Sequence, residues 1–154
     1  MDRPINIFDK VGSLIPGYTG YAERNNRRQC DKLLREKTTS IIISGEKLLS
    51  KRVATAIESN DHSLMKGMEE CRKKLNTIRD KIRYAPSGES AFFSSAQLKE
   101  EELLVIYQKD FALLNKANQI YQTLPELDAT TLSRAIGELE DILTERNEYI
   151  KEFK

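Results

Sequence analysis

Residues 30–57 read CDKLLREKTTSIIISGEKLLSKRVATAI, and this stretch decides the fold. It contains no proline and a single glycine, and its apolar side chains recur at spacings of three and four, as on a helix with one buried face. The pattern predicts one long helix over residues 20–60, roughly 60 Å in length. The helix propensity is lowest from Thr38 to Gly45, because this part contains β-branched residues and a glycine. A kink near Gly45 is the alternative that this run leaves open.

Three further helices are predicted, over residues 62–84, 95–123 and 129–153. The first of them carries apolar residues at alternating spacings of four and three, which is a coiled-coil-like seam. Turn-forming residues separate the three segments at 86–90 and 124–128. We therefore expect a single all-α domain over residues 1–154, an antiparallel four-helix bundle whose long first helix overhangs the others.

A short amphipathic helix is predicted within residues 1–18, because apolar residues recur there on one helical face and Pro16-Gly17 ends the pattern. This helix has two alternatives. It folds back over one end of the bundle, or it lies in a membrane interface, since tyrosines and arginines follow it. The candidate N-terminal surface, for a partner or a membrane, consists of Ile5, Phe8, Val11, Leu14, Ile15, Tyr18, Tyr21, Arg24, Arg27 and Arg28.

The charges divide unevenly between the two halves of the chain, although the net charge is only +1. Residues 1–84 carry eighteen Lys and Arg against eleven Asp and Glu, and residues 85–154 carry seven against thirteen. Two interpretations follow. A basic hairpin and an acidic hairpin screen each other, or the basic face stays free for an anionic partner.

The residues for common catalytic and metal sites are missing from the sequence. His62 is the single histidine, and Cys30 and Cys71 fall on predicted buried seams far from it in sequence. Di-iron, zinc and phosphate-loop patterns do not occur, so we expect no enzyme, no cofactor and no metal site. The two cysteines are predicted to be buried thiols of a cytoplasmic protein, which in the membrane alternative lies at the inner membrane face.

The start of the chain resembles that of a group of uncharacterised bacterial helical proteins. The shared features are Ile15-Pro16-Gly17-Tyr18-Thr19-Gly20-Tyr21, then Arg27-Arg28 and Asp31-Lys32 on the following helix. The resemblance covers about the first 35 residues and implies no function. A structural alternative for the same residues is that the tyrosines pin the start of the long helix.

These observations favour a non-enzymatic helical interaction or adaptor protein. A protein partner is expected, and a homo-oligomer is a second possibility. The alternatives are a peripheral membrane protein that uses the N-terminal surface, and weak nucleic-acid binding by the basic first hairpin. Nucleic acid is the less favoured partner, because the basic residues are interleaved with acidic ones and no binding motif occurs.

Overall fold

The computed structural model describes residues 6–85 and 90–154, and within these ranges all regular structure is helical, without a strand. The all-α prediction is therefore confirmed. The predicted site residue Ile5 lies outside the described residues. So does the turn predicted at residues 86–90, apart from Ser90. The helices are α1 (Ile7–Leu14), the 3-10 helix η1 (Arg24–Asn26), α2 (Arg27–Glu58), α3 (His62–Arg83), α4 (Ala91–Ser94), α5 (Glu100–Thr123) and α6 (Ala129–Glu152).

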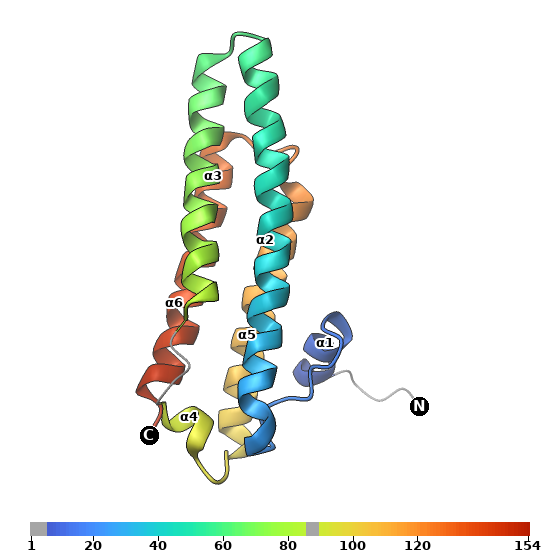
Figure 1. Ribbon diagram of the computed structural model, residues 1–154, viewed down its shortest axis with the longest axis vertical. Coiled ribbons are helices and arrows are strands. Elements are labelled where there is room, and N and C mark those ends of the chain that lie inside the picture. Colours follow the sequence, from blue (N-terminus) through green and yellow to red (C-terminus); the bar gives the residue numbers. More distant parts are fainter. Residues whose placement is uncertain (1–5, 86–89) are drawn as a thin grey trace.

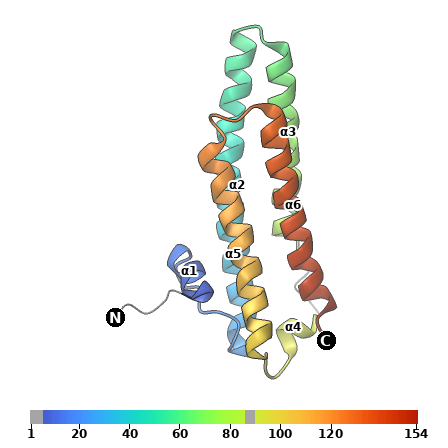
Figure 2. The same ribbon diagram turned by 180° about the vertical axis from the view of Figure 1, so that it is seen from behind.

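The four long helices lie side by side along one axis, and each runs opposite to the one before it in the chain (Figure 1). Both α2 and α6 pack against α3 and against α5, so α2 and α6 occupy opposite corners. The short helix α1 packs against α5, and α4 crosses the bundle at the end where the C-terminus lies (Figure 2). The shared core is built from the apolar faces of all four long helices.

The first long helix begins later than the sequence predicted, at Arg27 instead of residue 20. Gly17 and Gly20 adopt φ angles of +84° and +88°, which L side chains rarely adopt and which cannot continue a helix. At Gly20 an added Cβ would lie 2.4 Å from the Tyr107 hydroxyl. The segment between α1 and α2 is therefore a tight connection that only glycine permits.

From Arg27 onward α2 is continuous, and it runs through Gly45 without interruption. An added Cβ at Gly45 would lie 3.7 Å from a methyl group of Leu124 and 3.8 Å from one of Leu75. Both distances are ordinary van der Waals contacts, so the space beside Gly45 would accept a methyl group. The packing around Gly45 therefore does not explain a glycine in the middle of this long helix, where glycine lowers helix stability.

Side-chain hydrogen bonds cap the starts of α3 and α6. Asp61 accepts a hydrogen bond from the Leu64 N–H at 3.1 Å, and Asp128 accepts one from the Thr131 N–H at 2.8 Å. The predicted start of the third long helix at residue 95 is wrong, because Ala91–Ser94 form the separate helix α4 and α5 begins at Glu100. There Glu102 accepts a hydrogen bond from the Lys99 N–H at 2.7 Å.

The hairpin of α2 and α3 is longer than that of α5 and α6, so its turn projects beyond the α5–α6 connection (Figure 1). Arg52 marks the level where the shorter hairpin ends. Its Nη1 donates to the carbonyl of Leu124 at 2.9 Å and to that of Leu127 at 2.6 Å.

Candidate functional site

Five of the ten residues in the N-terminal surface predicted from the sequence are buried in the fold. Val11, Ile15, Tyr18 and Tyr21 are buried, and Arg27 is 0% exposed. Arg27 donates through Nε to the Tyr21 carbonyl at 2.8 Å and through Nη1 to the Ser95 carbonyl at 2.6 Å. These contacts contradict the prediction that these five residues form an accessible surface.

The other predicted residues of that surface are scattered. Phe8 is partly buried and packs on the core, with its ring 5.0 Å from the ring of Tyr107. Leu14, Arg24 and Arg28 are exposed, and the Arg28 guanidinium lies over the Phe93 ring at 5.1 Å. The apolar face of α1 therefore faces the protein, but α1 lies along the side of α5 and not across one end of the bundle as predicted (Figure 1).

The buried tyrosines belong to an ionic cluster formed by Asp31, Asp110 and Arg146 together with Tyr18 and Tyr21. The Arg146 Nε donates to Asp110 Oδ1 at 2.6 Å, and its Nη2 donates to Asp31 Oδ1 at 2.8 Å. Both tyrosine hydroxyls donate to Asp110 Oδ2, at 2.8 Å from Tyr18 and 2.5 Å from Tyr21. The cluster thus joins the α1–α2 connection to three of the long helices.

Burial sets the protonation behaviour of this cluster. Removal from water raises the pKa of Asp110, while Arg146 and the two hydroxyl donors act in the opposite direction. Burial alone would lower the pKa of Arg146, but the carboxylates of Asp110 and Asp31 hold it well above the usual range. Burial and the Asp110 charge also raise the pKa of Tyr18 and Tyr21. Both phenols therefore remain neutral hydrogen-bond donors well into the alkaline range.

The two cysteines are free and buried, as predicted. Burial, followed by the Asp110 charge, raises the pKa of Cys30 to about 12, so this thiol is not a nucleophile at neutral pH. His62 is exposed at the start of α3. Within residues 6–85 and 90–154, no three His, Cys, Asp or Glu side chains are grouped so that they could hold a metal ion. The ionic cluster around Arg146 is buried, and its hydrogen bonds and ion pairs hold the helices together.

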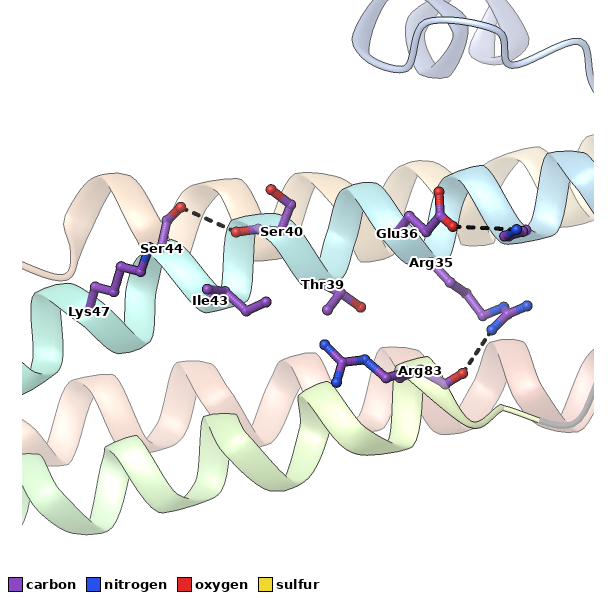
Figure 3. Close-up of a pocket in the computed structure, with 9 residues that line it drawn as sticks. Arg35, Glu36, Thr39, Ser40, Ile43, Ser44, Lys47 and Arg83 are labelled. Atoms are coloured by element: carbon purple, nitrogen blue, oxygen red, sulfur yellow. Dashed lines mark hydrogen bonds and ion pairs between the residues drawn. The ribbon is translucent and has the colours of Figure 1, made fainter.

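A groove on the outer side of α2 is accessible to solvent and is lined by several basic residues. It has a volume of about 590 Å³ and runs along one face of α2, closed on one side by Arg83 at the end of α3 (Figure 3). We call it the basic groove. It is lined by Lys32, Arg35, Glu36, Thr39, Ser40, Ile43, Ser44, Lys47 and Arg83.

Arg35 connects the basic groove to the buried ionic cluster. Its Nε donates to Asp31 Oδ2 at 2.9 Å, on the carboxylate whose other oxygen accepts from Arg146. Its Nη1 donates to the Arg83 carbonyl at 3.0 Å (Figure 3). Because these two hydrogen bonds fix the Arg35 side chain, this part of the groove is preorganised for a ligand.

Charge is separated across the bundle. Helices α2 and α3 carry fifteen Lys and Arg against seven Asp and Glu, whereas α5 and α6 carry five against ten. Among the described residues, Lys81–Glu140 at 2.9 Å is the surface ion pair between these two helix pairs, and Arg146–Asp31 is the buried one. Most of the opposite charge therefore remains on opposite outer faces instead of being paired between the hairpins.

Asp110 and Arg146 are the residues that sequence reasoning missed. Arg146 falls on the apolar face of its helix, between Leu143 and Ile150, and Asp110 lies between aromatic residues on α5. A charged residue at a core position is the available signal, because such a charge needs a buried partner. The signal does not say which partner, and this one lies 36 residues away.

None of the helices in the described ranges is long and apolar enough to cross a lipid bilayer. Searches against models of protein families, against curated proteins and against solved structures return no match for this chain.

Proposed function

We propose that this chain is a non-enzymatic interaction module, an antiparallel four-helix bundle that binds an acidic protein partner in the basic groove. The bundle supplies a rigid scaffold, and the groove supplies the recognition surface. The free thiols suit a reducing compartment, and we propose a cytoplasmic location on that basis.

The observation that supports this proposal most directly is the state of the cations around the groove. Among residues 6–85 and 90–154, Lys47 and Arg83 have no carboxylate partner, and Arg35 makes no bond through its Nη2. Hydroxyl groups of Thr39 and Ser40 line the floor between these cations. Carboxylates of a partner would therefore find both charge and neutral donors in one groove.

An acidic protein suits the groove better than nucleic acid does. Glu36 lies in the groove itself, so a continuous phosphate backbone would meet a carboxylate along its path. A membrane is supported less, because the apolar residues Val11 and Ile15 that would insert are buried in the protein.

The test is a titration of the purified chain with fluorescently labelled poly-L-glutamate at 10 mM and 1 M salt. We expect binding at low salt that is lost at high salt, because the Debye length falls from about 30 Å to about 3 Å. A Lys47→Glu/Arg83→Glu variant should bind at least about tenfold more weakly.

The control is Lys66→Glu/Lys73→Glu, which makes the same charge change at exposed positions of α3 outside the groove. If both double variants weaken binding equally, net charge and not the groove governs it, and the proposal is wrong. The proposal also fails if the wild-type chain ignores poly-L-glutamate but binds DNA or anionic vesicles at the same salt concentration.

A further inference from the structure

We infer that the partner of the basic groove is a second copy of this chain, which docks the outer face of its α6 there. The inference rests on the proposed function, since it names the occupant of the same groove. The chain itself carries an acidic helical face that matches the groove in charge and in length.

The acidic face of α6 is a single exposed row. Its members recur at spacings of three and four along the side of α6 opposite to the buried Leu139 and Leu143. The row consists of Glu138, Asp141, Glu145, Glu148 and Glu152. Glu138 pairs with Lys116 at 2.5 Å, and the other four have no ion pair with any described residue.

The row and the groove have the same length. From Glu138 to Glu152 is fourteen residues, or roughly 21 Å of helix, and from Lys32 to Lys47 is fifteen residues, or roughly 22 Å. The groove residues on α2 also recur at three and four, because they share one face of that helix. An α6 helix laid along α2 would thus bring carboxylates near Lys32 and Arg35 at one end of the groove and near Lys47 at the other, with the Thr39 and Ser40 hydroxyls between them.

The positions of the two surfaces determine the kind of assembly. Because α2 and α6 occupy opposite corners of the bundle, the groove and the acidic row of one molecule point in opposite directions. A two-fold dimer cannot engage both surfaces at once. The contact is therefore head-to-tail, and it continues as an open chain or closes into a ring.

The contact is electrostatic and exposed, so it should be weak and sensitive to salt. At about 100 µM protein and 10 mM salt, we expect sedimentation equilibrium to give an average mass above the 17.7 kDa of the monomer, increasing with concentration. At 1 M salt the mass should return to 17.7 kDa.

Charge reversal on either surface tests the pairing. Lys47→Glu/Arg83→Glu reverses the groove, and Glu145→Lys/Glu148→Lys reverses the row. Each variant alone should remain monomeric at low salt, whereas an equimolar mixture of the two should associate again. In that mixture the intact row of one variant meets the intact groove of the other. Urea denaturation confirms that both variants are folded.

Other outcomes separate this inference from the proposed function. If wild type binds poly-L-glutamate through the groove but stays monomeric at 10 mM salt, the proposed function holds and the second copy is not the partner. If Glu100→Lys/Glu101→Lys on α5 abolishes self-association as fully as the α6 reversal, or if the mixture fails to associate, the docking of α6 is refuted. Failure of both binding and association overturns both proposals.

Discussion

The two ends of the bundle are built in opposite ways. At the closed end, where α1 and α4 pack, Arg146 is 1% exposed and Asp110 is 0% exposed, and rings from several segments fill the space around them. At the open end the α2–α3 hairpin projects alone, with Ile57 58% exposed and Asn60 in a left-handed turn. A helical bundle can therefore end in a desolvated polar network or in a solvated turn.

The difference lies in what each end needs in order to be stable. The closed end joins segments far apart in the chain through charges that are costly to bury and have to be paired together. The open end depends on local bonds such as the Ser59 N–H to the Thr55 carbonyl at 3.1 Å. We therefore expect substitutions at the closed end to act on the whole fold, and those at the open end to act locally.

The largest effect should come from removing the arginine at the centre of the closed end. Arg146→Met leaves the carboxylates of Asp31 and Asp110 buried without their cation, and we expect a loss of about 3–5 kcal/mol in the free energy of unfolding. The measurement is urea denaturation followed by circular dichroism. Arg134→Met, at an exposed position of the same helix, is the control and should change the free energy by less than about 0.5 kcal/mol. A loss below about 1 kcal/mol for Arg146→Met would mean that the ion pairs contribute little.

Alkaline pH tests the same end without a mutation. Because the folded pKa of Tyr18 and Tyr21 lies above the unfolded value of 10.0, the unfolded chain loses these protons first. Their contribution is fully present below pH 10 and is lost as the pH rises above it. The free energy of unfolding should fall by about 1.4 kcal/mol per pH unit for each phenol. Tyr18→Phe should reduce this slope by the contribution of one phenol, about 1.4 kcal/mol per pH unit. An unchanged slope would show that the pKa of Tyr18 is the same in the folded and unfolded chain.

A smaller effect is expected at the boundary of the open end. Arg52→Ala removes the donor for the carbonyls of Leu124 and Leu127, which should cost about 1–3 kcal/mol. Hydrogen exchange should accelerate mainly in the α5–α6 connection and not around Asp110. The neighbouring exposed Lys51→Ala is the control. Faster exchange at the closed end as well would show that the two ends are coupled.

Two glycines give the most local comparison. At Gly67, close to the open end, an added Cβ would lie 2.7 Å from the Cβ of Ala129, so Gly67→Ala should cost about 1–3 kcal/mol. At Gly137 nothing lies within 4 Å, so Gly137→Ala should stabilise the helix by about 0.5–1 kcal/mol. Thermal unfolding of both variants measures the difference, and effects of equal sign would contradict the packing argument.

Periodicity made most of the helices predictable, because their apolar faces are continuous over many turns. The ranges 62–84 and 129–153 agree with α3 and α6 to within one residue. The starts of α2 and α5 were misplaced for local reasons. Gly20 has a positive φ angle and lies against Tyr107, which is distant in sequence. Phe92 with its neighbours forms a separate turn of helix.

The site was less predictable than the fold. Tyr18, Tyr21 and Arg27 look like a recognition surface in sequence. Amphipathic residues near a helix start can either bind a partner or pack inside the fold. Their partners Asp110 and Phe92 lie on segments whose proximity no local pattern encodes. The basic groove was visible only as an excess of charge in the first half of the chain, and the position of Arg83 beside Arg35 required the hairpin geometry.

The order of synthesis gives the α1–α2 connection a further consequence. Tyr21 leaves the ribosome 89 residues before Asp110 and 125 residues before Arg146, the residues that hold its hydroxyl. At about 5–20 residues per second, this delay is on the order of ten seconds. Throughout it the apolar face of α1, including Val11, has no α5 to cover it. The nascent chain therefore presents to chaperones the surface that the finished protein conceals.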